Sequence, residues 1–189
     1  MTLRPIRVCL ILAISKNNKI GGSTGLPWRM PSDLAHFRRV TTGKVMVMGR
    51  KTFDTINHKA ALNSVGRSLI IVSRRPHEVE MYGECIATIV GSVEEAIVSA
   101  KQITRIRNEQ EELMVTGGRE IYLQSLEQAS RIYLTVIDAH VTQGDVELPE
   151  LSEEALVSGG KWVVISRCAM YKKEVDEYDA EFVVLDRKP

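Results

Sequence analysis

The sequence predicts a single α/β domain in which a mostly parallel, twisted β-sheet ends in an antiparallel hairpin, with about four flanking helices. Short apolar runs rich in β-branched residues recur along the chain, and most of the segments between them have the pattern of amphipathic helices. Strands that alternate with helices are joined by right-handed crossovers and lie parallel. The last two apolar runs have no helical segment between them, which favours an antiparallel pair at the end of the sheet.

The predicted strands follow from these apolar runs. Several runs are apolar at every position rather than at alternate positions, which is typical of strands buried on both faces of a sheet. The earlier runs are residues 8–14, 45–48, 69–72, 86–90, 113–116 and 132–137. Two later runs, 161–171 and 180–186, are joined by the charged turn KKEVDEYD and form the predicted hairpin.

The predicted helices are placed by their start signals. Ser32 is expected to cap the first helix, and Gly118 leads into the last one. Ser92, followed three residues later by Glu95, is a capping-box pattern that opens a long helix. The helical segments are 32–41, a short segment from Thr52, 92–107 and 118–127. After Thr135 the helical pattern stops, so no later helix is expected.

The composition fits one domain over residues 1–189, because a chain of 189 residues with 44% hydrophobic residues can bury one substantial core. Lys and Arg number 25 against 24 acidic residues, so the net charge of +1 supplies no field to recruit nucleic acid or an anionic membrane. We therefore expect a monomer whose partner is a small molecule.

The cysteines indicate neither disulfides nor a metal site. Cys9, Cys85 and Cys168 are odd in number and widely spaced, and no CxxC pair or histidine cluster accompanies them. The apolar run near the start is too short to span a bilayer and lacks a small-residue cleavage signal. We expect a cytoplasmic protein.

Four predicted strand ends carry residues suited to a phosphorylated ligand. Ligands of open parallel sheets bind beyond the carboxyl ends of the strands, and these ends are followed by Gly49-Arg50-Lys51-Thr52, Ser73-Arg74-Arg75, Gly117-Gly118 and the loop AISKNNKIGGSTGLPW. Each alone is explained by a turn or by surface charge, and neither G-x-G-x-x-G nor a P-loop motif is present. Two of these segments are basic and suited to hold phosphate; Arg50-Lys51 and Ser73-Arg74-Arg75 are called the phosphate grips below. Together with the Gly-Gly helix start, they predict a ligand with a pyrophosphate and an additional phosphate.

Asp33 lies near the start of a predicted helix, in the stretch GLPWRMPSDLAHFRR. An acid at this place is usually explained by the helix dipole alone, which contributes about 0.3–1 kcal/mol. Asp33 also shares a helix face with Phe37, toward the pocket that Leu26, Trp28 and the first strand are expected to enclose. A carboxylate there can accept paired hydrogen bonds from an amidine-like N–C–N edge, with Phe37 as an aromatic wall.

The chain resembles the dihydrofolate reductase family over essentially its whole length. The blocks that carry the resemblance are LILAIS, IGGSTGLPWRMPSDLAHFRR, VMVMGRKTF, GRSLIIVSR, LMVTGGREIY and IYLTVIDA, in this order. The resemblance implies an eight-stranded sheet, NADPH as the hydride donor and dihydrofolate as the acceptor, in the service of one-carbon metabolism. The aspartate at position 33, in place of a glutamate, resembles the bacterial branch of the family.

The resemblance also implies roles for individual residues. Asp33 resembles the acid that holds the pterin, Thr135 the hydroxyl behind it, and Arg67 the arginine that pairs with the glutamate carboxylate of folate. The implied catalytic residues are Asp33, Trp28 and Thr135, and the implied substrate-binding residues are Ile11, Ala13, Leu34, Phe37, Arg38, Ile56, Arg67, Thr116 and Tyr122. The implied cofactor-binding residues are Ala13, Ile20, Gly21, Gly22, Ser23, Thr24, Gly25, Leu26, Gly49, Arg50, Lys51, Thr52, Ser73, Arg74, Gly117, Gly118, Arg119, Glu120, Ile121 and Tyr122.

The reaction needs a hydride on a C=N carbon and a proton on its nitrogen. Asp33 is the one ionisable residue that the matching segments offer, so we infer that it orients the pterin and favours its protonated form, while the proton arrives through water. Two departures from the family pattern stand out. The segment 57–65 is longer than common, and Arg119 replaces a small residue.

Two other functions remain open from the sequence. A related reductase of riboflavin biosynthesis would share the strands and the NADPH grips, but it should not carry the PW…D…F constellation. A noncatalytic pterin- or nucleotide-binding module would fit the composition equally well.

Overall fold

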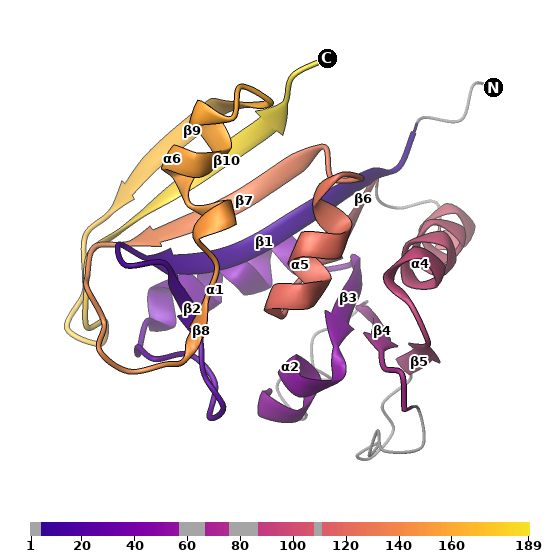
Figure 1. Ribbon diagram of the computed structural model, residues 1–189, viewed down its shortest axis with the longest axis horizontal. Coiled ribbons are helices and arrows are strands. Elements are labelled where there is room, and N and C mark those ends of the chain that lie inside the picture. The colour runs from indigo at the N-terminus through magenta and orange to yellow at the C-terminus, as the bar shows by residue number, and fades with distance from the viewer. Residues whose placement is uncertain (1–4, 57–66, 76–86, 108–110) are drawn as a thin grey trace.

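One eight-stranded sheet runs through the computed structural model, which describes residues 5–56, 67–75, 87–107 and 111–189 (Figure 1). The strand order is β5-β4-β3-β6-β1-β7-β10-β9. The strands are β1 Arg7–Ser15, β3 Val45–Gly49, β4 Ser68–Val72, β5 Ala87–Val90, β6 Glu112–Val115, β7 Arg131–Ile137, β9 Trp162–Met170 and β10 Ala180–Arg187. A separate two-stranded ribbon pairs β2 Lys19–Gly21 with β8 Val146–Glu147.

The pairing within the sheet confirms the predicted fold class. Neighbouring strands from β5 to β7 are parallel, β10 is antiparallel to β7, and β9 is antiparallel to β10. The helices are α1 Pro31–Thr41, α2 Arg50–Thr55, α4 Val93–Arg107, α5 Arg119–Leu126, α6 Glu153–Ser158 and the 3-10 turn η2 Pro149–Leu151. None of the described helices is long and apolar enough to cross a membrane.

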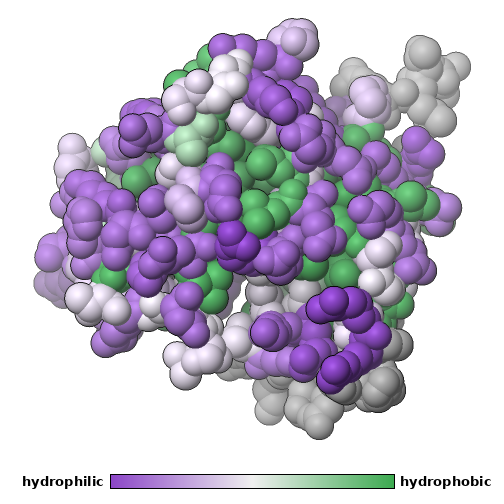
Figure 2. All heavy atoms as spheres, viewed as in Figure 1, coloured by the Kyte–Doolittle hydropathy of each residue, from purple (hydrophilic) through white to green (hydrophobic). Residues whose placement is uncertain are grey.

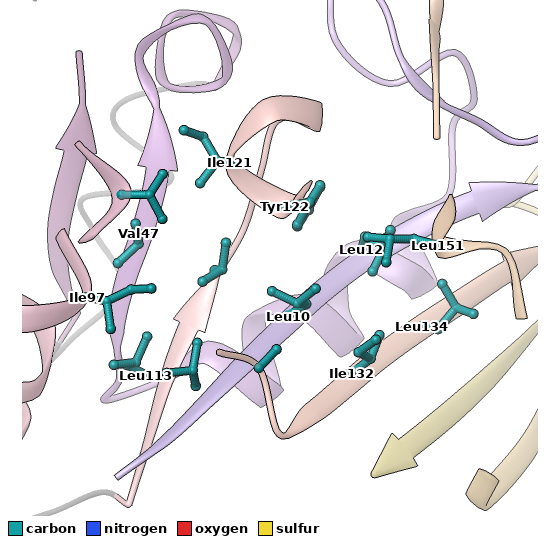
Figure 3. Packing of buried hydrophobic residues seen from close by; sticks show 14 of the residues in the cluster. Leu10, Leu12, Val47, Ile97, Leu113, Ile121, Tyr122, Ile132, Leu134 and Leu151 are labelled. Carbon is teal, nitrogen blue, oxygen red and sulfur yellow. The ribbon is translucent and has the colours of Figure 1, made fainter. Parts of the chain in front are cut away.

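Helices cover both faces of the sheet, which explains why its central strands are apolar at every position (Figure 1). On one face, residues such as Leu10 and Val47 pack with Ile97 of α4 and Tyr122 of α5 (Figure 3). On the other face, the alternate residues of the same strands pack with Phe53 of α2 and with Phe37 and Val40 of α1. Full burial of one such side chain contributes about 1.5–3 kcal/mol, so both faces stabilise the sheet.

The helix starts confirm one predicted cap and correct another. Ser92 Oγ accepts the Glu95 N–H at 3.1 Å, and the Glu95 carboxylate accepts the Gly91 N–H at 3.0 Å, so α4 begins as its capping pattern predicts. The prediction that Ser32 caps α1 is wrong, because α1 begins earlier, at Pro31, and its N-cap Met30 makes no side-chain cap. Proline suits the first helical position, where no N–H partner is needed.

The second short helix, α2, begins at Arg50 rather than at Thr52. The expectation that no helix follows Thr135 is wrong, since α6 and η2 lie between β8 and β9. Ser152 Oγ caps α6 by accepting the Ala155 N–H at 3.2 Å, and two glutamates occupy its first turn. A serine followed by two acids is a helix-start signal, but six residues are too few to show a helical period.

The ribbon of β2 and β8 fixes the glycine-containing loop that follows β1. The Leu148 N–H donates to the Asn18 carbonyl at 2.9 Å, and Lys19 lies opposite Glu147 in the ribbon. Gly144 has φ +84, and a Cβ there would lie 2.7 Å from the Gly21 carbonyl oxygen. Glycine at 144 therefore permits the close approach of the two segments.

Gly144→Ala is expected to release this loop. Gly160 offers a matched control, because it has φ +73 but a Cβ there would meet no atom within 4 Å. Gly160→Ala should cost about 1–2 kcal/mol in the free energy of unfolding, since residue 160 adopts the left-handed conformation. Gly144→Ala should cost more, because its Cβ would also clash with the Gly21 carbonyl oxygen. In hydrogen exchange, only Gly144→Ala should lose amide protection over residues 18–22. Equal protection of these amides in the two variants would contradict the role given to Gly144.

Candidate active site

The candidate active site begins where β1 and β7 lie side by side and α1 crosses them. Ala13 of β1 is in register with Thr135 of β7, and Phe182 of β10 is opposite Thr135 on its other side. Asp33, in the first turn of α1, is 8% exposed, and Thr135 is 3% exposed. The structure thus brings the predicted acid and the predicted hydroxyl together in a buried environment.

The environment of Asp33 changes its proton affinity. Burial raises the pKa of Asp33 to about 6, a hydrogen bond with the Thr135 hydroxyl lowers it, and the negative charge of Asp176 raises it. Burial dominates because removing a carboxylate from water disfavours its ionised form. Asp33 therefore changes charge close to neutral pH, as is common for carboxylates at functional sites.

Two aromatic residues of the candidate site, Tyr122 and Trp28, are buried, and Tyr122 lies close enough to Asp33 to feel its charge. The Tyr122 hydroxyl donates to the Ile11 carbonyl at 2.7 Å, and burial together with the charge of Asp33 raises the pKa of Tyr122, so it remains a neutral donor. Trp28 is buried and packs with Met30 and Ala13. Its indole Nε1 has no hydrogen-bond partner among the described residues.

Arg67 lies against the C-terminal end of α1. Its guanidinium donates to the Arg38 carbonyl at 3.0 Å and lies 5.9 Å from the centroid of the Phe37 ring. Burial lowers the pKa of Arg67, and the charge of Arg38 acts in the same direction. The predicted aromatic wall and the predicted cation are thus neighbours. The Ile56 side chain packs in the same apolar cluster as Phe37, and Leu34 is exposed on α1.

A second part of the site lies where β3 and β6 end. The Gly49 N–H donates to the Gly117 carbonyl at 2.7 Å. A Cβ at Gly118 would lie 3.0 Å from Thr52 Oγ1, and one at Gly49 would lie 3.0 Å from Ile121 Cγ1. A Cβ at either position would press on a neighbouring side chain, so glycine at both positions favours the close approach of the two strand ends.

Because of this packing, α2 and α5 begin side by side. Neither helix start has a side-chain cap. Unpaired N–H groups at helix starts favour anions, and two adjacent starts fit the two phosphates of a dinucleotide. The residues present therefore fit the pyrophosphate that the sequence predicts.

The predicted phosphate grips differ in their surroundings. Ser73, at the end of β4, is buried and accepts the Arg75 N–H at 3.1 Å, whereas Arg74 is exposed. Arg50 forms an ion pair with Asp54 at 3.0 Å on α2. These side chains lie at the same sheet edge, because β3 and β4 are parallel neighbours.

Arg119 has a different arrangement from the other predicted cofactor residues. Its guanidinium donates to the Glu147 carbonyl at 3.0 Å and pairs with Glu150 at 2.9 Å and Glu120 at 3.0 Å. These contacts join α5 to the segment that contains β8. A direct contact of Arg119 with the cofactor stays a prediction.

The loop that contains residues 20–26 borders the remaining side of the site. Ser23, Thr24 and Leu26 are exposed, while Gly22 and Gly25 exchange backbone hydrogen bonds of 2.8 and 3.1 Å. Figure 2 shows the surface notched between the part of the molecule that carries α2 and the part that carries β2 and β8 in Figure 1. No group of three His, Cys, Asp or Glu side chains suited to a metal ion occurs in the described ranges.

Comparison with known proteins identifies the family. The family model described as dihydrofolate reductase matches residues 7–187. This chain belongs to the dihydrofolate reductase family. It is 34% identical to the type 3 dihydrofolate reductase of Salmonella typhimurium over 181 residues, which cover 96% of this chain and 98% of that protein. It is 33% identical to the dihydrofolate reductase of Bacillus subtilis, with 96% and 95% of the two chains covered.

Among solved structures, the chain is similar to dihydrofolate reductase from Enterococcus faecalis complexed with NADP(H) and RAB-propyl, with a TM-score of 0.75. The sequence identity is 21%, and the match covers 97% of each chain. The fold of the dihydrofolate reductase family is thus confirmed here, as is the family membership that the sequence motifs predicted. The family consists of oxidoreductases that use NADPH, so the function class inferred from the sequence is also confirmed.

One residue of the site was not found from the sequence. Asp176 lies in the stretch that we interpreted only as a charged turn, and yet it is 6% exposed and acts on Asp33. The two positions are 143 residues apart in the sequence numbering (176 − 33), and no local pattern links them. This turn reaches α1 only because β10, which follows it, pairs with β7 in antiparallel orientation.

Asp33→Asn is expected to stabilise the unliganded protein at pH 8 by about 1–3 kcal/mol. The folded pKa of about 6 lies above the ordinary 3.8, so the proton on Asp33 stabilises the fold below pH 4, and this contribution is lost as the pH rises through 6. At pH 8 the wild type buries a charge that asparagine lacks. Urea unfolding at pH 8 and pH 4 measures the difference, and a gain of the same size at both pH values would contradict this assignment.

Proposed function

We propose that this chain catalyses the NADPH-dependent reduction of 7,8-dihydrofolate to 5,6,7,8-tetrahydrofolate, with Asp33 as the residue that binds and activates the pterin. The observation that carries the proposal is the buried Asp33 carboxylate with Thr135 at its side, next to two helix starts suited to a pyrophosphate. The names of the curated relatives support the choice of substrate.

The proposed binding mode of dihydrofolate follows α1 from its start to its end. The Asp33 carboxylate accepts two hydrogen bonds from the N–C–N edge of the pterin, a charge-assisted bidentate geometry. Phe37 packs against the aminobenzoyl ring, and Arg67 pairs with the glutamate carboxylate. The position of Arg67 over Phe37 supports this order, because it places an anion site one ring away from an aromatic wall.

Proton delivery is assigned to water and is controlled by Asp33. An ionised Asp33 stabilises positive charge on the bound pterin and so favours the protonated imine. The Trp28 indole N–H is a donor that a water molecule or the substrate can use, since it has no partner in the described part of the chain. Tyr122 is committed to the Ile11 carbonyl and remains neutral, so we assign it no proton transfer.

The residues that would hold NADPH are those at the ends of β3, β4 and β6. When bound, NADPH supplies the hydride. Gly49, Gly117 and Gly118 leave room for a close backbone approach at the starts of α2 and α5. Ser73 and Arg74, with Arg50 nearby, are assigned to the additional phosphate. The NADP(H) in the Enterococcus faecalis complex supports this assignment.

We also propose that the protein acts as a monomer in the cytoplasm and binds no nucleic acid. The balanced charge supports the absence of a nucleic-acid partner. Cys9 and Cys168 are free thiols, and an exposed free thiol such as Cys168 suits a reducing compartment.

Asp33→Asn tests the central assignment. It keeps the shape of the side chain but removes the charge that favours the protonated pterin. Hydride transfer should fall by roughly 10²- to 10⁴-fold at neutral pH and recover in part at lower pH, where solution supplies the proton. NADPH oxidation with dihydrofolate, followed from pH 5 to pH 9, measures this. Activity within threefold of wild type at pH 7 would rule out the proposed role.

Arg67→Ala tests the position of the substrate tail. Loss of the charge-assisted pair should cost about 1.5–3 kcal/mol in affinity for dihydrofolate, and little for a pterin that has no glutamate. Arg67→Lys keeps the charge but not the planar fork, so its affinity for dihydrofolate should lie between those of wild type and Arg67→Ala. Equal losses for both ligands would show that Arg67 supports α1 rather than the substrate.

The cofactor preference tests the phosphate grips. The wild type should strongly prefer NADPH over NADH, and Arg74→Ala and Arg50→Ala should each weaken NADPH about tenfold while NADH is nearly unchanged. Arg105→Ala is the matched control, since Arg105 is an exposed arginine on α4. Added salt should reduce the preference, because exposed charge pairs are screened. If wild-type kcat/KM were about equal for NADPH and NADH, the assignment of these residues to the additional phosphate would be wrong.

A further inference from the structure

The first turn of α1 is held from outside by the turn between β9 and β10. Asp176 of this turn accepts the Ser32 N–H at 2.9 Å and the Ser32 hydroxyl at 2.6 Å. It also accepts the Lys173 N–H at 3.2 Å, and it is 6% exposed. Burial raises the pKa of Asp176, but the hydrogen bonds from Ser32 and Lys173 outweigh it and leave this pKa below its usual range. Asp176 is therefore ionised at neutral pH.

Further contacts join the same two segments. Arg29 donates its N–H to the Glu177 carboxylate at 2.9 Å and accepts the Glu177 N–H at 3.1 Å. The Tyr178 N–H donates to Met30 Sδ at 3.4 Å. The segment that immediately precedes Asp33 is thus fixed along its length to the turn.

This arrangement has a direct consequence for Asp33. The first turn of a helix needs acceptors for its free N–H groups, and α1 has no side-chain cap of its own. Asp176 supplies that acceptor from a distant part of the chain. Because Asp33 follows Ser32 directly, a rotation of the first turn would also rotate the Asp33 carboxylate.

We propose that Asp176 is a positioning residue for the reduction, which fixes the Asp33 carboxylate through Ser32 and adds a second negative charge beside it. The proposal rests on the function proposed above. The charge of Asp176 also raises the pKa of Asp33, in the direction expected for two neighbouring carboxylates. Burial is the larger cause of the raised pKa of Asp33, and the charge of Asp176 adds to it.

In the described part of the chain, the neighbouring groups Tyr122, Thr135 and His36 do not supply the negative charge that Asp176 places near Asp33. Tyr122 of α5 is neutral, and Thr135 of β7 does not titrate in this range. On α1 itself, His36 lies three residues on and stacks on Phe182, with ring centroids 4.0 Å apart. Burial lowers the pKa of His36, and Arg39 acts in the same direction, so the ring is neutral at pH 7.

Two substitutions separate the two effects of Asp176. Asp176→Asn removes its charge but keeps an acceptor for the Ser32 N–H. Ser32→Ala removes the hydroxyl contact and leaves both carboxylates in place. Asp179→Asn is the matched control, because Asp179 is an exposed acid of the same turn whose carboxylate accepts the Lys172 N–H at 2.7 Å, within the turn itself.

The experiment is the pH profile of hydride transfer from pH 5 to pH 9 in the whole chain, with NADPH binding as the check on folding. Asp176→Asn should move the midpoint of the profile down by about half a pH unit, the order expected for the loss of a partly screened neighbouring charge. The rate at pH 7.5 should fall severalfold. Ser32→Ala should lower the rate at every pH and leave the midpoint unchanged, and Asp179→Asn should match wild type.

The outcomes separate this proposal from the proposed function. A wild type that does not reduce dihydrofolate would refute the function itself. An active wild type whose midpoint is the same in Asp176→Asn and Asp179→Asn would overturn the role of Asp176. If Asp176→Asn does not fold, Asp176→Glu decides, because it retains the charge at a longer reach: the rate should fall while the midpoint stays at the wild-type value. A wild-type rate in Asp176→Glu would then refute the positioning role.

Discussion

The burial of one carboxylate, that of Asp33, is the constraint on which the site depends. Removing a charge from water is costly, and it is tolerated only where hydrogen bonds and neighbouring groups compensate. Thr135 supplies a hydrogen bond, and burial raises the pKa to about 6. The same low-polarity environment strengthens any contact between this carboxylate and a bound cation. A feature that costs stability in the free protein is therefore the one to which we assign the binding and activation of the pterin.

The parallel sheet gathers the rest of the site at one edge. Since β1, β3, β4, β6 and β7 all run in the same direction, their carboxyl ends lie together. Glycines at the ends of β3 and β6 let α2 and α5 begin in contact, which brings the positive ends of two helix dipoles together. Thr135, beside the Asp33 carboxylate, lies on the strand at one side of β1, and the helix starts follow strands on the other side, so the proposed sites for hydride acceptor and donor are adjacent. Substrate and cofactor sites thus follow from a single topology.

Much of the fold and of the site could be predicted because the signals are local. The apolar runs predicted all eight strands of the main sheet, since strands buried on both faces need apolar residues throughout. The motif around Asp33 predicted Phe37 as an aromatic wall, and the separate block GRSLIIV pointed to Arg67 through the family resemblance; the structure places these two side chains next to each other. The short helix α6 and the ribbon of β2 and β8 escaped prediction, because two to six residues carry too little periodicity.

The sequence by itself determined the family and the order of the strands along the chain, and it singled out Asp33 as the candidate acid, since each depends on residue types within short segments. Only the tertiary structure decided how that acid is held. Ser32 has the sequence of a helix cap, but α1 begins at Pro31, and the acceptor for its first turn is Asp176, from the last hairpin of the sheet. Arg119 likewise follows the Gly-Gly pair but is engaged by Glu150. Both outcomes depend on which distant acid folding brings within hydrogen-bonding reach, a distance of about 3 Å that no local pattern specifies.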